Sequence, residues 1–513
     1  MHAASTSRHP IRAALATLMC ITVALAAPAA SAGTATGDGS AQPDPKSLAT
    51  ELTQHVTVDG VHRHLRALQR IADANGGTRA ASTPGYDASL DYVAGQLSAA
   101  GFEVSTPEFD YQAEIIDAAR LEIGGRQVEI RPMAYSPSTP SGGVTGPLVV
   151  VPDDGCEATD YAGGTATGAV ALIRRGTCPF TQKQQVAADL GALTAVIANN
   201  EPGPLDGTLG DQAAGRIPTG GISQADGDAL LGSGGTPTTV ELRLHYEDRV
   251  SRNVIAQTRS GRTDNVVMAG AHLDSVEEGP GINDNGSGSA TLLETALQLG
   301  GNPAVNNAVR FAWWGAEEAG LLGSDAYVTG LSPEQQLDIA LYLNFDMVGS
   351  PNPAYFAYDG DDSDVEGAGP GPTGSAQIEA AFIDYLTGQL NVPVEGTDFD
   401  GRSDYGPFIA VGIPAGGLFT GAEDIKTPEQ AAKWGGSADV AFDPCYHQAC
   451  DTLGNIDRTA LDRNSDAMAW VTATYSISTE NVNGVPSREQ RAELQGNARP
   501  LAGTQFHGHQ VIT

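Results

Sequence analysis

The chain has little positive charge. Its 513 residues include 28 lysine and arginine residues against 62 aspartate and glutamate residues, so the formal net charge is -34. This imbalance argues against nucleic acid or an anionic membrane as a partner, because either would be repelled by an acidic surface. An excess of acidic residues is typical of a surface that keeps a protein soluble. At this length, two folded units with flanking tails are expected rather than one core.

Long hydrophobic runs are also scarce, and the one that stands out lies at the N-terminus. Arg8 and Arg12 precede the apolar run "AALATLMCITVALAA", and the small residues "ASA" follow soon after. This pattern predicts a Sec-type signal peptide, residues 1–32, with cleavage after Ala32. Cys20 lacks the small residues that usually precede a lipidated cysteine. The protein is therefore expected to be secreted and extracellular, without a stable membrane anchor.

Cysteine is scarce as well, and four of the five cysteines remain once the signal peptide is removed. An even number in an oxidising compartment indicates two disulfides. Neighbours in the sequence pair most simply, which predicts Cys156–Cys178 and Cys445–Cys450. A zinc site with four cysteines is the alternative. It is weaker, because a zinc ribbon requires tight spacing in both pairs and only the second pair has it.

Local patterns divide the mature chain into segments. A low-complexity linker or propeptide remnant, 33–50, precedes a helical stretch, 51–112, which closes with one predicted strand, "FEVSTPEFDY". Residues 113–245 carry short β-branched strands between turns rich in glycine and proline. Residues 246–480 alternate strands with helices, and a polar tail, 481–513, follows. This alternation predicts an α/β fold with a mixed, mostly parallel sheet and helices on both faces, whose reactive loops lie at the carboxyl ends of the strands.

Histidine is scarce in the alternating segment. Two histidines lie between Val250 and Ser478: His272 in "GAHLDS" and His447 in "CYHQACD". A lone histidine is more often packed than ligated, but both of these adjoin acidic motifs. His272 follows the strand "NVVMAGA", and Asp274 is placed to accept its far N–H, as the partners of metal-bound histidines do. Cys445 and Cys450 lie on either side of His447, and a disulfide between them would make its loop rigid.

Carboxylates complete a possible metal site. Asp284 in "GINDNGSGSA" would by itself be read as a helix cap. Asp346 ends the apolar run "LYLNFDMV", where a buried carboxylate requires a cation or several donors. Glu317 and Glu318 in "GAEEAGLLGS" follow a buried strand and repel each other unless a positive charge lies nearby. With the two histidines, these acids form a nitrogen and oxygen set suited to zinc or a comparable divalent ion, with one bridging carboxylate and one glutamate left as a base.

Five ordered motifs carry a resemblance to a known family. "AHLDS", "GINDNGSG", "WGAEEAGLLGS", "NFDMVG" and "CYHQACD" resemble the M28 family of co-catalytic zinc aminopeptidases, in particular its secreted Streptomyces-type members. The resemblance implies a zinc-exopeptidase fold and two Zn²⁺ ions per chain, held by five ligands: His272, Asp284, Glu318, Asp346 and His447. It also implies that Asp284 bridges the ions, that Glu317 is the general base and that Tyr446 stabilises the oxyanion.

Two further stretches resemble parts of known proteins. "DGCEATDYAGGTATGAVALIRRGTCPFTQKQQVAADLGALTAVIANN" is similar to a protease-associated (PA) domain, here inserted as residues 113–245. It either caps the cleft or has no catalytic effect, and both readings stay open. Arg402 and Phe419 in "DGRSDYGPFIAVGIPAGGLFTGAE" resemble pocket residues of the Streptomyces-type members. Phe419 predicts a preference for leucine or similar bulky apolar residues, although core packing of Phe419 and a simple ion pair of Arg402 are alternatives.

The sequence therefore predicts a monomeric, secreted metallo-aminopeptidase that acts on the N-termini of peptides or proteins. The resemblance implies that Glu317 and Asp346 are the partners of the substrate ammonium. The alternatives are a glutaminyl-cyclase-like acyltransferase with one zinc, a non-catalytic binding protein stabilised by metal, and a carboxypeptidase or dipeptidase. Asp462 and Asp466 share one helical face and suggest a Ca²⁺ site. Two aspartates do not supply the six or more oxygens that Ca²⁺ requires, so solvated carboxylates are favoured.

Overall fold

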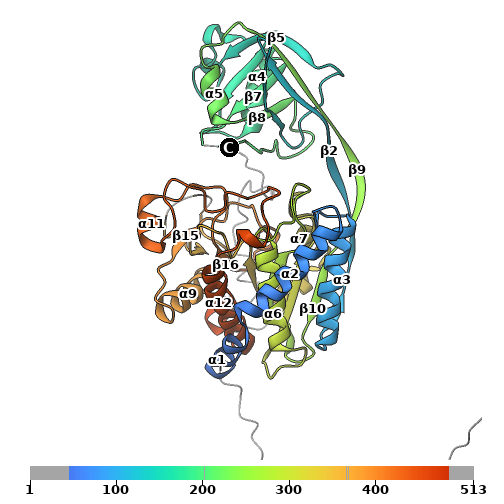
Figure 1. Ribbon diagram of the computed structural model, residues 1–513, viewed down its shortest axis with the longest axis vertical. Helices are drawn as coiled ribbons and strands as arrows, with labels where there is room; N and C mark the ends of the chain where they lie inside the picture. The colour runs from blue at the N-terminus through green and yellow to red at the C-terminus, as the bar shows by residue number, and fades with distance from the viewer. Residues whose placement is uncertain (1–44, 202, 365–366, 368, 485–513) are drawn as a thin grey trace, which may run out of the picture. The chain divides into compact units, whose positions relative to one another are not determined.

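The computed structural model describes residues 45–201, 203–364, 367 and 369–484 (Figure 1). The predicted signal peptide, most of the predicted linker and most of the polar tail lie outside the described residues. Within the described ranges, no helix combines the length and the apolar character needed to cross a membrane. Two sheets of eight strands each organise this part of the chain.

The first sheet has parallel strands at its centre and antiparallel strands toward its edges. Its order is β1 (Glu103–Ser105), β10 (Val254–Gln257), β12 (Asn307–Trp314), β11 (Arg262–His272), β13 (Ile339–Phe345), β16 (Ala415–Phe419), β14 (Phe356–Tyr358) and β15 (Glu395–Thr397). The neighbours β12, β11, β13 and β16 are parallel. Strands β1, β10 and β14 pair antiparallel with their inner neighbours. The predicted mixed α/β sheet is confirmed.

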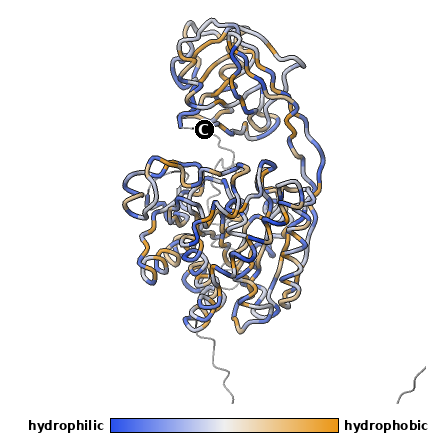
Figure 2. The backbone as a smooth tube through the Cα atoms, viewed as in Figure 1, coloured by the Kyte–Doolittle hydropathy of each residue, from blue (hydrophilic) through white to orange (hydrophobic). Residues whose placement is uncertain are grey.

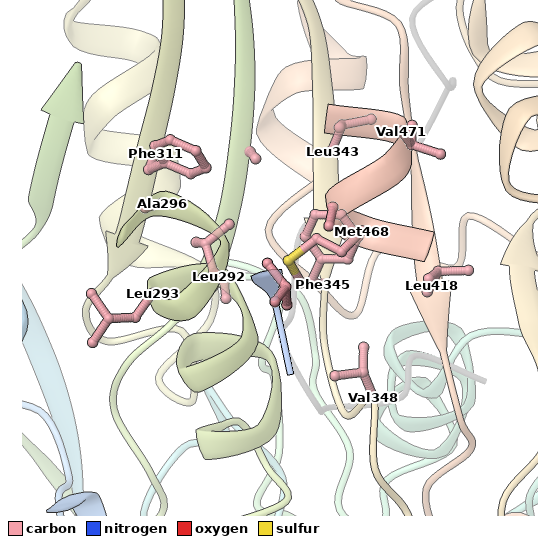
Figure 3. Packing of buried hydrophobic residues seen from close by; sticks show 14 of the residues in the cluster. Leu292, Leu293, Ala296, Phe311, Leu343, Phe345, Val348, Leu418, Met468 and Val471 are labelled. Carbon is pink, nitrogen blue, oxygen red and sulfur yellow. The ribbon is translucent and has the colours of Figure 1, made fainter. Parts of the chain in front are cut away.

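Helices cover both faces of this sheet. One face packs against α1 (Pro45–His55), α2 (Val58–Ala74), α3 (Pro84–Ala99), α6 (Gly286–Leu299), α9 (Ser375–Gly388) and α12 (Arg458–Ile477). The other packs against α7 (Leu322–Gly330) and α10 (Gly406–Ala410). Successive side chains of a strand point to opposite faces. Accordingly, Val267 and Ala269 of β11 join the first core and Met268 joins the second. In Figure 3, Leu292 of α6 lies beside Phe345 of β13 and Met468 of α12.

The early helices form where their sequence signals predict them. The Thr57 side chain caps α2 by accepting the backbone N–H of Gly60, and Thr83 caps α3 ahead of Pro84. The single strand predicted from "FEVSTPEFDY" is wrong, since β1 and β2 (Glu108–Ile123) are separate strands in different sheets. Pro107 lies between them and has no N–H to continue a ladder. The remaining helices of the segment 246–484 are α8 (Pro333–Leu337), α11 (Pro428–Trp434), α13 (Glu480–Asn483) and the short 3₁₀ turn Leu453–Asn455.

The second sheet is built mainly from the segment predicted to be rich in short strands. Its order is β3 (Arg126–Val128), β2, β9 (Pro237–Arg252), β5 (Val144–Val150), β6 (Val170–Arg174), β7 (Thr194–Ala198), β8 (Thr219–Ile222) and β4 (Arg131–Pro132). Strands β6 and β7 are apolar on both faces, and Figure 2 shows apolar segments running through strands of both sheets. The structure adds helices that the prediction omitted, namely α4 (Phe180–Asp189), α5 (Gln224–Leu230) and the 3₁₀ turns Ala158–Asp160 and Ala162–Gly164.

A long two-stranded ribbon, β2 with β9, links the two sheets along the chain (Figure 1). Its antiparallel register begins with Glu108 opposite Arg252 and ends with Ile123 opposite Thr238. The register shifts between Ile116 and Ala118, where one strand carries an extra residue.

Candidate active site

The predicted ligands gather at the carboxyl edge of the parallel strands. His272 is the last residue of β11, and Asp346 directly follows β13. Glu317 and Glu318 lie in the turn after β12, and Asp284 lies just before α6. Carboxyl ends of neighbouring parallel strands meet at the same edge, so residues far apart in sequence converge there.

Asp284 lies between the two histidines. Its Oδ1 is 3.2 Å from His272 Nε2, and its Oδ2 is 3.1 Å from His447 Nε2. Each histidine has a second carboxylate of its own. His272 Nε2 is 3.3 Å from Asp346 Oδ1, and His447 Nε2 is 3.2 Å from Glu318 Oε2. The five side chains therefore form two sets that share Asp284.

Glu317 lies beside this arrangement. Its Oε2 is 3.9 Å from His272 Nε2, and the residue is 3 % exposed. The side chains of His272, Glu317 and Asp346 each offer a ligand atom, and these atoms lie within 4.8 Å of one another. Glu317 thus reaches the edge of the first set without taking part in the contacts of the second.

The electrostatics show that this group of residues attracts positive charge. Burial lowers the pKa of His447, but Glu318 and Asp284 raise it to about 10. Burial likewise opposes protonation of His272, yet Asp346 and Glu317 hold its pKa well above the usual range. Burial, together with nearby carboxylates, raises the pKa of Glu317. The nearby carboxylates therefore favour the protonated form of both imidazoles. The same carboxylates would be stabilised by bound cations.

The donor set fits divalent metal ions. Imidazole nitrogen and carboxylate oxygen are the ligands expected for zinc. Buried Asp346 Oδ1 receives no hydrogen bond from any residue that the structure describes, and it faces His272 Nε2. A buried carboxylate oxygen without a donor is costly, and a bound cation removes that cost. His272, Asp346 and Asp284 would hold one ion, and His447, Glu318 and Asp284 a second.

Asp274 supports the site in a different way from that predicted. His272 Nδ1 is 3.2 Å from the backbone carbonyl oxygen of Asp274, and the carboxylate Oδ1 is more distant at 3.7 Å. The carboxylate instead accepts the backbone N–H groups of Glu317, at 3.2 Å, and Glu318, at 3.4 Å. Asp274 therefore orients the histidine through its backbone and the glutamate turn through its side chain.

The loop that carries His447 is closed by a disulfide. Cys445 and Cys450 are bonded, as are Cys156 and Cys178, so both predicted disulfides are present. The φ of His447 is 55°, in the left-handed region that few residues other than glycine adopt. A short closed ring helps to hold such a backbone conformation.

Tyr446 and Arg402 contact each other beside His447. The rings of Tyr446 and His447 stack with centroids 3.7 Å apart. Arg402 donates from Nη2 to the Tyr446 hydroxyl at 3.2 Å and pairs with Glu423 at 2.9 Å. The predicted ion pair of Arg402 thus exists, and it also positions the tyrosine.

A cavity of ≈ 90 Å³ opens directly onto the ligands. Phe419, Arg402, Tyr446 and Tyr358 are among the residues that line it. Phe419 also packs against Phe356, with ring centroids 6.1 Å apart. The two predicted pocket residues therefore share one cavity with the ligand set.

Several supporting residues were missed in the sequence. Ser403 donates to Asp346 Oδ2 at 2.6 Å. Asp451 accepts the backbone N–H groups of Asn283 at 2.8 Å and Asp284 at 3.0 Å. A signal was available for both, because Ser403 follows Arg402 and Asp451 is the last letter of "CYHQACD".

The two aspartates considered for calcium lie on α12. Asp462 is exposed and Asp466 is half-buried. Burial, and then the charge of Asp462, raises the pKa of Asp466 to about 7. Neither residue belongs to a group of three metal-binding side chains among the described residues. Solvated carboxylates, rather than a Ca²⁺ site, stay the favoured prediction for this pair.

Comparison with known proteins identifies the family. The model of peptidase family M28 matches residues 253–472, and the PA domain model matches residues 144–230. The chain is 50 % identical over 456 residues to the probable lipoprotein aminopeptidase LpqL of Mycobacterium tuberculosis, covering 88 % of this chain and 91 % of that protein. It is 42 % identical over 447 residues to leucine aminopeptidase 2 of Trichophyton tonsurans, covering 86 % and 89 %.

Solved structures agree. The aminopeptidase from Aneurinibacillus sp. strain AM-1 has a TM-score of 0.65 and 28 % identity, covering 83 % of this chain and 95 % of that one. The zinc aminopeptidase BSAP from Bacillus subtilis has a TM-score of 0.62 and 25 % identity, covering 82 % and 96 %. The chain therefore belongs to peptidase family M28, and it is a metallo-aminopeptidase that carries a PA domain.

Proposed function

We propose that the chain is a secreted di-zinc aminopeptidase that hydrolyses the N-terminal peptide bond of peptides and favours bulky apolar residues such as leucine. The position of Asp284 carries this proposal, because one of its oxygens faces His272 and the other faces His447. A carboxylate shared between two ligand sets is the arrangement that a two-metal hydrolase needs. The names of the zinc enzyme from Bacillus subtilis and of the leucine aminopeptidase from Trichophyton tonsurans support the metal and the substrate.

The alternatives explain less of the site. A single-zinc acyltransferase would use one ligand set and leave the other buried carboxylates without a cation. A structural zinc site is saturated by four protein ligands and needs no base beside it. Here Glu317 lies beside the two sets as a separate carboxylate. Two ligand sets and an adjacent base are accounted for together by metal-assisted hydrolysis.

Each side chain then has a defined task. Bound zinc supplies Lewis-acid polarisation of the scissile carbonyl and lowers the pKa of coordinated water. Glu317 takes the proton of the attacking water and passes it to the leaving amine. The Tyr446 hydroxyl donates to the developing oxyanion, and the hydrogen bond from Arg402 leaves its proton directed away from the guanidinium. Glu317 and Asp346 attract the substrate ammonium.

The pocket supports attack at a chain end. The cavity of ≈ 90 Å³ beside the ligand set has room for one side chain. Phe419 gives this cavity an apolar wall. An apolar side chain in the pocket, with its ammonium near the carboxylates, places the first peptide bond beside Glu317.

The test uses leucyl-p-nitroanilide and its N-acetyl derivative. The purified protein should hydrolyse the first and not the second, since acetylation removes the ammonium. Chelation should abolish the activity and zinc should restore it. The Glu317→Gln variant should bind zinc and turn over slowly. Wild-type turnover by this variant would refute the assignment of the base, and cyclisation of an N-terminal glutaminyl peptide would favour the acyltransferase.

Organisation and processing follow from the same proposal. We expect a monomer in which a PA domain, 113–245, interrupts a peptidase domain formed by 51–112 and 246–480. Light scattering on the secreted protein measures the mass, and N-terminal sequencing should begin at Gly33. Comparing a leucyl anilide with a long peptide, in the presence and absence of the PA domain, separates a cap that restricts substrate size from a module without catalytic effect.

A further inference from the structure

Arg79 is a buried arginine in the segment between α2 and α3, and it is 0 % exposed. Its guanidinium bonds to backbone carbonyl oxygens. Nε donates to Pro280 at 2.8 Å, Nη2 donates to Gly281 at 2.5 Å, and Nη1 donates to Leu273. The proposed chemistry assigns no role to this side chain.

The three acceptors lie at the two ends of one loop. Leu273 directly follows the ligand His272, and Gly281 lies three residues before the ligand Asp284. One rigid, planar guanidinium therefore ties the start of this loop to its end. The loop joins the two residues whose separation defines the first ligand set, His272 Nε2 and Asp284 Oδ1 at 3.2 Å.

Neighbouring contacts hold the same loop at its middle. The backbone N–H of Arg79 donates to Ser275 Oγ at 3.0 Å. The Thr78 hydroxyl donates to the carbonyl oxygen of Val276 at 2.7 Å. Residues 78 and 79 thus contact the loop at its start, middle and end, from a segment that is about 200 positions away in the chain.

The charge of Arg79 also lies near the site. Burial lowers its pKa to about 10, and the carboxylates of Asp274, Asp451, Asp284 and Glu318 oppose that fall. The guanidinium is therefore protonated at neutral pH. A fixed positive charge near carboxylates that repel one another reduces the cost of bringing them together before metal binds.

We infer that Arg79 is a positioning residue that sets the spacing of His272 and Asp284 before metal enters, so that zinc binds a ready-made site. This inference rests on the proposed function, because it concerns the affinity for the metal that function requires. Arg79 acts through the loop backbone, so its loss should weaken metal binding rather than remove a ligand. Partners that orient metal ligands commonly contribute about 10- to 100-fold in affinity.

The decisive variant is Arg79→Lys, which keeps the positive charge but loses the planar guanidinium that bonds to three carbonyl oxygens at once. Zinc affinity is measured on the metal-free full-length protein by competition with a chromophoric chelator, at a temperature well below melting. We expect zinc to bind about 10- to 100-fold more weakly. At saturating zinc, KM should change little while kcat falls. The loop between His272 and Asp284 is then less rigid, and the two ligands spend less time at the spacing that the reaction needs.

Two further variants separate positioning from general stability. Lys183→Met removes a cation that is also buried and bonded to backbone carbonyls, but on α4, and it should lower the melting temperature without changing zinc affinity. Ser275→Ala removes the hydroxyl that accepts the backbone N–H of Arg79 and that also contacts Thr78 and the Gly279 carbonyl oxygen. It keeps the guanidinium contacts of Arg79, so it should weaken zinc binding a fewfold. It serves as the test if Arg79→Lys does not fold.

The outcomes are distinct. If Arg79→Lys and Ser275→Ala both bind zinc with wild-type affinity, with or without a lower melting temperature, the inference is wrong and Arg79 is only structural. If the wild-type protein itself fails to bind zinc in the same titration, the proposed function fails and the inference falls with it. Weaker binding by the arginine and serine variants, with unchanged binding by Lys183→Met, supports the positioning role.

Discussion

Glu317 and Glu318 are neighbours in the chain but turn their carboxylates toward different histidines. Glu317 Oε2 is 3.9 Å from His272 Nε2, whereas Glu318 Oε2 is 3.2 Å from His447 Nε2. The Asp274 carboxylate holds the backbone N–H of both. One turn thus places two like charges in different local environments.

The first prediction concerns this division of labour. Glu317→Gln should keep both zinc ions and lose about 10²- to 10⁴-fold in kcat, the usual contribution of a general base. Glu318→Gln should instead lose one equivalent of zinc, because a ligand is removed. Elemental analysis and kcat are measured on the same preparations. Equal zinc loss in both variants would contradict the division.

The second prediction concerns the shared carboxylate. Asp284→Asn should lose both equivalents of zinc, because the residue belongs to both ligand sets. Asp346→Asn should lose one equivalent, because Asp346 faces only His272. Elemental analysis after dialysis against a weak chelator measures the difference. A single equivalent retained by Asp284→Asn would show that it does not bridge.

The third prediction concerns the ring around His447. Replacing Cys445 and Cys450 with serine should weaken the binding of one zinc equivalent by at least about tenfold, since the loop that orients the ligand is released. Replacing Cys156 and Cys178 is the matched control and should change thermal stability without changing zinc affinity. Chelator competition on both double variants decides between them.

The fourth prediction concerns the pocket. Phe419→Ala should raise KM for leucyl-p-nitroanilide about tenfold and change KM for the alanyl substrate little, because the lost apolar contact serves only the larger side chain. Measuring both substrates on one preparation controls for zinc content. An equal rise for both would return Phe419 to the role of core packing, as its contact with Phe356 allows.

The fifth prediction concerns Glu379 on α9, away from the metal ligands. Burial, and then the charges of nearby aspartates, raises its pKa to about 7, although the backbone N–H of Gly360 favours the charged form. A raised carboxyl pKa means that the folded state binds more protons than the unfolded state between about pH 4.5 and 7. Stability from this group is therefore complete below that window and is lost as pH rises through it.

The variant Glu379→Gln has no such proton to lose. Its melting temperature relative to wild type should rise between pH 5 and pH 8 by about 2–4 °C, which corresponds to roughly 1 kcal/mol in a domain of moderate size. Calorimetry at both pH values, on metal-free and zinc-loaded protein, measures this shift. A constant difference across the two pH values would mean that Glu379 is ionised in the fold throughout.

The sequence predicts the candidate site better than it predicts the support of that site. Strand ends can be recognised from apolar runs, and His272, Glu317 and Asp346 each follow one, so their convergence at one sheet edge follows from parallel pairing. Arg79 lies in "GGTRAAST", where nothing local marks it, because its partners are about 200 residues away. Such a contact becomes visible only once the fold is known.

The same distinction explains the errors in the fold. Helices α2 and α3 were predictable because both have a threonine cap and an apolar period. Helix α5 spans only seven residues and has little apolar period, so its sequence does not stand out from the neighbouring turns. The length of β2 cannot be predicted from its sequence, because much of the strand faces solvent and lacks the apolar residues that mark a strand.

The ribbon of β2 and β9 has a consequence for how such a chain can be assembled. Glu108 and Arg252 lie opposite each other, so the chain enters and leaves the ribbon at neighbouring positions. A whole domain can be inserted or removed at this point without changing the path of the strands that carry the ligands. Related hydrolases could in this way carry or lack an inserted domain and keep the same ligand residues.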